Sequence, residues 1–189
     1  MMMIQIVPAI KRLSLTGIGC WSNLVVDFIL GLNIITGDCV CGKSTILRAI
    51  LQAVHPLHPD RCPLTPTYPS TSGTIGIEFS RDSVVLDIPV FAGIPEKTDV
   101  SESRGQLMLS QLRSHIAGAT CGFALLIEDA ATAGLDDLQL RQAAEALNTA
   151  TSQIISIIGY RFSLKDFPDA RVYRCYPDDK IHSRIERIQ

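Results

Sequence analysis

The sequence predicts an α/β domain with a mostly parallel sheet flanked by helices, and three observations support this prediction. A short apolar strand pattern at 31–36 leads through a glycine-containing loop into a helical pattern at 44–54. A bare apolar run, Phe123–Ile127, is followed directly by two acidic residues, which is typical of a central parallel strand. Strand and helix patterns then alternate, so parallel strands joined by crossover helices are expected.

The first thirty residues carry strand patterns of another kind. Residues 4–14 have a strand-like mixture of side chains, and Asn23–Phe28 alternates between apolar and polar residues. Alternation of this kind is typical of strands that bury one face. We therefore expect a small N-terminal antiparallel β-subdomain that leads into the strand at 31–36.

The loop after that strand carries the clearest chemical signal. It reads GDCVCGKST and matches G-x-x-x-x-G-K-[ST], in which backbone N–H groups surround a phosphate. Lys43 would reach the outer phosphates, Ser44 would ligate Mg²⁺, and the helix would begin at the anion. The flanking strand and helix argue against a chance match, so the loop predicts binding of a nucleotide's phosphates with Mg²⁺. The expected binding residues are Gly37, Asp38, Cys39, Val40, Cys41, Gly42, Lys43, Ser44 and Thr45.

The segment 54–100 is expected to be an excursion from a single domain that spans residues 1–189. Its prolines exclude regular helix and central strand over much of its length. The expected parts are a proline-studded loop at 55–69, a β-hairpin of strands 74–79 and 83–90, and a linker at 91–98.

Three residues of the proline-studded loop have spacings that could bind zinc. They are His55, His58 and Cys62. No fourth ligand is nearby, and the prolines explain the segment without a metal. We therefore favour a loop that holds no zinc.

The second half of the chain carries the remaining elements. Two apolar stretches, Phe123–Ile127 and 153–158, have the length of buried strands, and a helical pattern at 138–149 lies between them. The expected order is a helix from 101 onward, the strand Phe123–Ile127, a helix at 138–149, a strand at 153–158 and a last strand at Arg171–Cys175.

Two carboxylates, Glu128 and Asp129, follow the bare apolar strand. A Mg²⁺-nucleotide site needs acids at this edge of the sheet, one near the metal and one to orient the attacking water. By position, Glu128 would serve the metal together with Ser44, and Asp129 would serve the water. The alternative is that both are solvated acids that open a loop.

Composition and charge narrow the classes of partner. The chain has 19 acidic and 17 basic residues and a net charge of −2, so no overall field attracts DNA or an anionic membrane. No apolar run reaches the ~20 residues of a membrane span, and the first residues lack a signal-peptide layout.

We expect a cytoplasmic protein whose six scattered cysteines are reduced. Its 47% hydrophobic content hints that another subunit covers some apolar surface.

The order of these motifs resembles the ABC-type ATPase heads. The phosphate loop is followed by Ser-Arg-Gly-Gln at 103–106, Leu-Leu-Ile-Glu-Asp at 125–129 and Ala-Gly-Leu-Asp at 133–136. The opening segment, residues 13–37, is especially similar to the branch with RecF, the structural-maintenance-of-chromosomes (SMC) proteins and the overcoming-lysogenisation-defect ATPases. The resemblance covers nearly the whole chain and implies the P-loop NTPase fold with ATP hydrolysis.

The resemblance also implies a site shared between two copies of the chain. Ser103 and Gly105 match the serine and second glycine of the family's signature motif, which caps the γ-phosphate held by the other subunit. Asp136 matches the aspartate that bridges the subunits. The implied assembly is a homodimer around two ATP molecules. A polar helix N-cap is the alternative role for the serine segment.

Two residues that the family uses have no counterpart. No glutamine lies between Gln52 and Gln106, where the Q-loop glutamine is expected, and Ile158 and Gly159 stand where the switch histidine is expected. We therefore expect slow hydrolysis with binding and dimerisation retained. In the same family setting Trp21 could stack on adenine, but we favour a place in the core.

The phosphate loop has two unusual residues, Cys39 and Cys41. Near a helix N-terminus and Lys43 a thiol's pKa is expected to fall, so oxidation could block the site. The alternative, which we favour, is that both cysteines are tolerated small residues.

Three functions follow from these observations. The first is an ABC-type ATPase that passes its conformational change to a DNA-related partner or effector, of the DNA repair or phage-defence type. The second is a non-catalytic, ATP-dependent assembly module, favoured by the two missing residues. The third is the nucleotide-binding subunit of a transporter, which the absent Q-loop glutamine disfavours.

Overall fold

The computed structural model describes eight segments of the chain, with side chains given except at residues 4–6 and 85–91. The described segments contain two sheets and two long helices. The described segments are residues 4–54, 64–67, 72–80, 85–91, 113–116, 122–128, 135–159 and 162–189.

The larger sheet has six strands in the order β1-β7-β8-β4-β9-β10. The four central strands run parallel to one another, and β1 and β10 are antiparallel edge strands. The predicted mostly parallel sheet is confirmed. The strands are β1 (Ile4–Pro8), β7 (Phe123–Ile127), β8 (Gln153–Ile157), β4 (Leu32–Gly37), β9 (Arg171–Pro177) and β10 (Ser183–Arg187).

The smaller sheet has four antiparallel strands in the order β3-β2-β5-β6. The predicted N-terminal antiparallel subdomain is therefore confirmed, and the predicted hairpin extends it, because β5 pairs with β2. The first strand, β1, instead pairs with β7 in the larger sheet. The strands are β2 (Ile10–Ile18), β3 (Trp21–Asp27), β5 (Ser72–Phe79) and β6 (Val85–Phe91).

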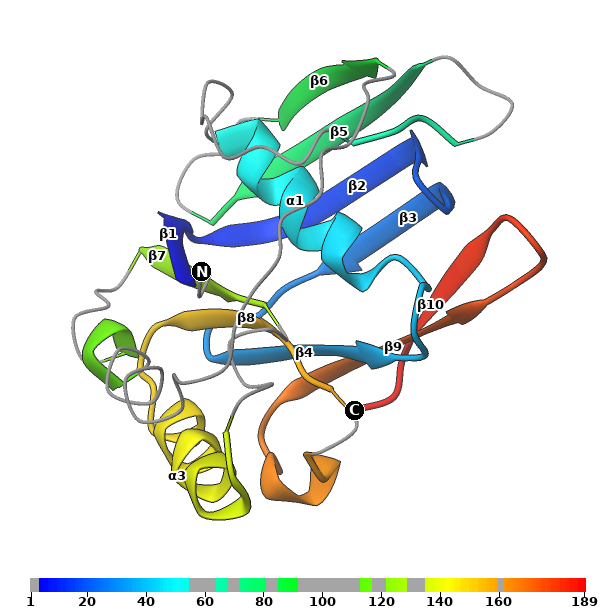
Figure 1. Cartoon of the computed structure of the whole chain (residues 1–189). Helices are drawn as coiled ribbons and strands as arrows, with labels where there is room; N and C mark the ends of the chain where they lie inside the picture. Colours follow the sequence, from blue (N-terminus) through cyan, green and yellow to red (C-terminus); the bar gives the residue numbers. More distant parts are fainter. Residues whose placement is uncertain are drawn as a thin grey trace.

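The helices lie on opposite faces of the larger sheet. Helix α1 (Lys43–Val54) shares one apolar core with residues of both sheets, and it lies alongside β2 and β5 in Figure 1. Helix α3 (Asp137–Asn148) and the short 3₁₀ helix η2 (Leu164–Asp166) cover the second core on the other face. The predicted helices on both faces are confirmed, and the larger sheet is buried between them.

Buried polar side chains fix the two sheets relative to each other. Gln153 of β8, which is 1% exposed, accepts from the Ile10 amide at 2.8 Å and donates to the Ile10 carbonyl at 2.8 Å. Arg171 and Tyr173 of β9 both donate to the carbonyl oxygen of Asp27 at the end of β3, at 2.9 and 2.6 Å. Each bond joins one sheet to the other, so the two sheets are held together near the amino ends of β8 and β9.

Candidate nucleotide-binding site

The phosphate loop lies at the carboxyl edge of the parallel strands. Strand β4 ends at Gly37 and α1 begins at Lys43, so the loop lies where ligands bind in parallel α/β sheets. The first turn of α1 has amides with no intrahelical partner, and its dipole favours an anion at this end. The predicted strand, loop and helix are all confirmed.

Both glycines of the loop motif are required by close contacts. Gly37 has φ +133°, and a Cβ there would lie 1.9 Å from the carbonyl oxygen of Cys175 in the neighbouring strand β9. Gly42 has φ +79°, and a Cβ there would lie 2.2 Å from the Cys20 Sγ and 2.7 Å from the Trp21 Nε1. The backbone therefore approaches its neighbours where a side chain would not fit, and both ends of the loop are held in place.

Trp21 acts on the loop from within the core. Its side chain is 0% exposed, and its indole Nε1 donates to the Gly42 carbonyl oxygen at 3.1 Å. A fully buried ring cannot stack on a base, so the core interpretation is confirmed. No sequence pattern indicates this bond, because the two residues are twenty-one positions apart and lie in different elements.

Lys43 folds back over the loop that precedes it. Its Nζ donates to the carbonyl oxygens of Gly37 at 2.9 Å and Asp38 at 2.5 Å. These bonds place the ammonium over the loop, and Ser44 is the next residue of the helix. The loop amides, the ammonium and the hydroxyl are the donor set that a Mg²⁺-nucleotide needs, so the residues present fit this ligand.

The two loop cysteines differ in their surroundings. Cys39 is exposed, whereas Cys41 is 2% exposed and donates from Sγ to the Asp38 carbonyl oxygen at 2.8 Å. Burial raises the pKa of the Cys41 thiol, and the nearby Lys43 charge only partly opposes this. The predicted fall in thiol pKa is wrong for Cys41. Burial likewise raises the pKa of Cys175, with the neighbouring Cys41 as a further cause.

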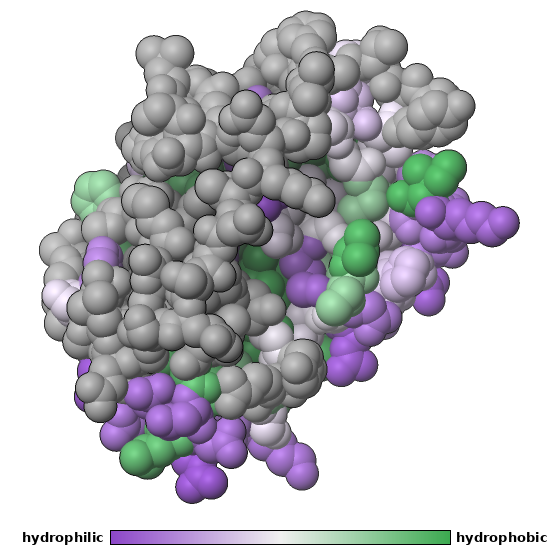
Figure 2. All heavy atoms as spheres, in the orientation of Figure 1, coloured by the Kyte–Doolittle hydropathy of each residue, from purple (hydrophilic) through white to green (hydrophobic). Residues whose placement is uncertain are grey.

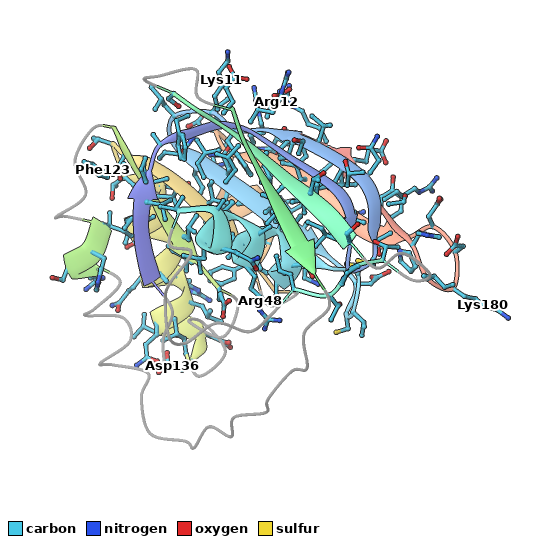
Figure 3. The ribbon with its side chains drawn as sticks, turned by 90° about the horizontal axis from the view of Figure 1, so that it is seen from above. Lys11, Arg12, Arg48, Phe123, Asp136 and Lys180 are labelled. Carbon is cyan, nitrogen blue, oxygen red and sulfur yellow. The ribbon has the colours of Figure 1, made fainter. Side chains whose placement is uncertain are left out.

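Glu128 follows β7 at the same edge of the sheet as the phosphate loop. Only β8 lies between β7 and β4, and strands are spaced about 4.8 Å apart, so the two strand ends are roughly 10 Å apart. Burial raises the pKa of the half-buried Glu128 carboxyl, and Arg48 on α1 pulls it down. Figure 3 shows Arg48 projecting from α1. Glu128 therefore lies at the same edge of the sheet as the loop, and its role toward a metal stays a prediction.

Asp136 has a local role in this chain. Its carboxylate accepts from the Gln139 amide at 2.8 Å, and the Gln139 side chain accepts from the Asp136 amide at 3.0 Å, which forms a capping box at the start of α3. Asp136 is also exposed, so the cap leaves the residue open to solvent. The predicted bridge to a second copy stays a prediction.

Several predicted site residues lie outside the described part of the chain. They are Asp129, Ser103 and Gly105, together with the zinc candidates His55, His58 and Cys62. Within the described segments no group of three or more histidine, cysteine or acidic residues is arranged to hold a metal ion. No helix in those segments is long and apolar enough to cross a membrane.

Comparison with known proteins agrees with this geometry. Residues 12–79 match the family model described as an AAA domain. The fold is similar to the SMC head domain from Thermotoga maritima, with a TM-score of 0.58, 11% identity and coverage of 96% of this chain and 99% of that one. It is also similar to the SmcHead bound to the C-winged helix domain of ScpA, with a TM-score of 0.64, 12% identity and coverage of 96% and 98%. No curated protein matches the sequence.

Taken with the loop, these matches define a P-loop NTPase fold. Within that class, the combination of an antiparallel sheet, α1 and a mostly parallel sheet is the fold seen in the SMC head domains. The resemblance stated from the sequence motifs is therefore confirmed for the fold.

Proposed function

We propose that this chain is an ABC-type ATPase that binds Mg-ATP and hydrolyses it slowly. The observation that carries the proposal is the loop from Gly37 to Lys43, whose glycines are held by close backbone and side-chain contacts and whose lysine lies over the loop. A bound nucleotide supplies the phosphoryl group that water attacks. The chain's own contribution is to position that group and the water.

Each site residue has a distinct part in this proposal. The loop amides and Lys43 bind the phosphates, and Ser44 with Glu128 holds Mg²⁺. Burial favours the protonated form of the Glu128 carboxyl, and a bound cation would favour the carboxylate. Asp129 orients the attacking water.

The proposal includes a dimer, because Ser103 and Gly105 match the motif that caps the γ-phosphate held by a second copy. After β8 the buried Ile158 and the half-buried Gly159 stand in place of a switch histidine, and no glutamine lies between Gln52 and Gln106 where the Q-loop glutamine is expected, so hydrolysis is slow. Ser103 and Gly105 of a second copy would complete each site, with Asp136 at the contact. Two ATP molecules would then hold the dimer closed until hydrolysis.

A protein effector is the partner that we propose for the dimer, with DNA reached through that effector. One similar head is bound to the C-winged helix domain of ScpA. In the described part of this chain the neighbouring cations Lys11 and Arg12 are paired, with Glu78 and Asp27, each at 2.5 Å. Exposed hydrophobic residues on the face in Figure 2 form separate spots among hydrophilic ones. These features favour a mixed protein surface over direct DNA binding.

Sedimentation of the chain with Mg-ATP and with Mg-ADP tests this proposal. The Asp129→Ala variant should form a dimer with Mg-ATP and remain a monomer with Mg-ADP, because slowed hydrolysis preserves the closed state. Lys43→Ala should remain a monomer with either nucleotide. A monomer under all conditions, with ATP bound, would contradict the sandwiched dimer.

A second function, a non-catalytic ATP-dependent assembly module, is favoured by the missing glutamine and histidine. It predicts the same dimer with Mg-ATP. Phosphate release would then stay at the background rate in wild type and in Asp129→Ala alike.

A further inference from the structure

Val40 has an unusual backbone conformation at the centre of the phosphate loop. Among the described residues it is the only non-glycine residue with positive φ, at +66°. This left-handed region is unfavourable for L-residues, and most of all for β-branched side chains. Glycine occupies the region without penalty, and asparagine tolerates it better than other residues do.

Packing does not compensate for this conformation. The Val40 side chain is 97% exposed, so its methyl groups gain almost nothing from burial in this chain. The strain at this position is therefore a net cost of the loop conformation.

The neighbours of Val40 cannot take up the strain. Gly37 is held against the backbone of Cys175, and Gly42 is held by Cys20 and Trp21. Between them, Cys41 is buried and its Sγ is bonded to the Asp38 carbonyl oxygen at 2.8 Å. With both ends and Cys41 fixed, the turn depends on the left-handed residue at position 40.

We propose that Val40 limits the affinity of the loop for the phosphate tail of a nucleoside triphosphate, an inference that rests on the proposed ATP-binding function. Because Gly37, Gly42 and Cys41 are held, the loop can relieve the strain only by giving up some of those contacts. The relaxed conformation, in which Val40 has negative φ, then competes with the phosphate-binding one. A ligand that binds only the first conformation has its apparent affinity reduced by the fraction of molecules in that conformation. The penalty of a left-handed L-residue corresponds to roughly a 5- to 30-fold reduction.

Calorimetry of Mg-ATP binding to a series of Val40 variants tests the proposal. Val40→Gly should bind roughly 5- to 30-fold more tightly than wild type. Val40→Asn should bind more tightly than Val40→Ala, because asparagine tolerates positive φ better although it is the larger residue. An order Gly, Asn, Ala, Val therefore follows backbone preference, whereas an order that follows side-chain size would overturn the proposal.

Leu30→Gly is the matched control. Leu30 is an exposed apolar residue outside the loop and has no positive φ, so glycine there adds flexibility without relieving strain. It should leave the affinity for Mg-ATP unchanged. Equal affinities of wild type and Val40→Gly would overturn this inference alone. If neither they nor the asparagine variant bound ATP, the proposed function itself would fail, and the inference with it.

Discussion

The two halves of the candidate site differ in what holds them in place. On the β4 side, Gly37 and Gly42 approach neighbouring atoms so closely that neither position has room for a side chain, and Trp21 donates a hydrogen bond to Gly42 from the core. On the β7 side, the structure describes Glu128 of the acidic pair. Burial raises the pKa of this half-buried carboxyl, and the charge of Arg48 lowers it. The half that we propose to bind phosphates is thus built from backbone contacts of the fold, whereas the half that we propose to support hydrolysis depends on individual side chains. Substitutions should therefore separate the two halves.

The largest effect is expected from Asp129→Ala. Loss of a residue that orients the attacking water should lower the turnover number by about 10²- to 10⁴-fold and leave ATP affinity nearly intact. Steady-state phosphate release together with calorimetry measures both quantities. Glu145→Ala, which removes an exposed acid on α3, is the control and should change neither. Unchanged turnover in Asp129→Ala would remove Asp129 from the mechanism.

A smaller but still large effect is expected from Gly37→Ala. The new Cβ would meet the Cys175 carbonyl oxygen in a strand that cannot easily move, at a φ unsuited to alanine. The free energy of unfolding should fall by about 2–5 kcal/mol, and ATP binding should be lost. Denaturant unfolding gives the first quantity.

Gly31→Ala is the control for this substitution. Gly31 has φ +94°, and the space that its Cβ would enter is open to 4 Å, so alanine there carries the backbone strain without the clash. Its cost should be about 1–2 kcal/mol, with ATP binding retained. Equal costs at both positions would show that the contact with Cys175 is not what requires glycine at position 37.

Trp21→Phe should have an intermediate effect. Phenylalanine retains most of the apolar volume but leaves the Gly42 carbonyl oxygen with the Thr45 amide alone as donor. The expected loss is about 1–3 kcal/mol of unfolding free energy, with weaker ATP binding because the end of the loop is released. Circular dichroism during denaturation and calorimetry measure the two effects. Wild-type affinity in a destabilised variant would limit Trp21 to a packing role.

The smallest effect is the pH dependence of Glu128. Burial raises the folded-state pKa of Glu128 above its ordinary value of 4.5. The contribution of this carboxyl to the free energy of unfolding is therefore fully present below pH 4.5 and is lost as pH rises through the folded-state pKa. Glu128→Gln should therefore unfold at a higher temperature than wild type at pH 7, and the difference should vanish at pH 4. Thermal melts at the two pH values measure this. A variant less stable than wild type at pH 7 would contradict the burial effect.

Sequence patterns predicted the features of this molecule that depend on residues close together in the sequence. The loop motif identified Gly37, Gly42 and Lys43, and the bare strand Phe123–Ile127 placed Glu128 at the sheet edge. The edge strand β10, which pairs with β9, was missed because its residues Ser-Arg-Ile-Glu-Arg are mostly charged. An edge strand with a polar, exposed sequence lacks the apolar pattern by which strands are recognised.

The remaining features of the site depend on contacts between distant residues. The Trp21 bond to Gly42, the approach of Cys175 to Gly37 and the burial of Cys41 all require the assembled sheets. The expected fall in the Cys41 pKa failed for this reason, since the sequence shows the nearby lysine but not the desolvation. The φ of Val40 is equally hidden, because the loop motif accepts any residue at that position.

Calorimetric titration of the wild-type chain and Lys43→Ala with Mg-ATP tests the central claim most directly. The phosphate loop should give one binding event per chain in the wild type. Removal of the Lys43 ammonium should weaken or abolish that event while the variant keeps the wild-type circular dichroism spectrum. Absence of binding by the folded wild type, or equal affinity in the two proteins, would contradict a phosphate site at this loop.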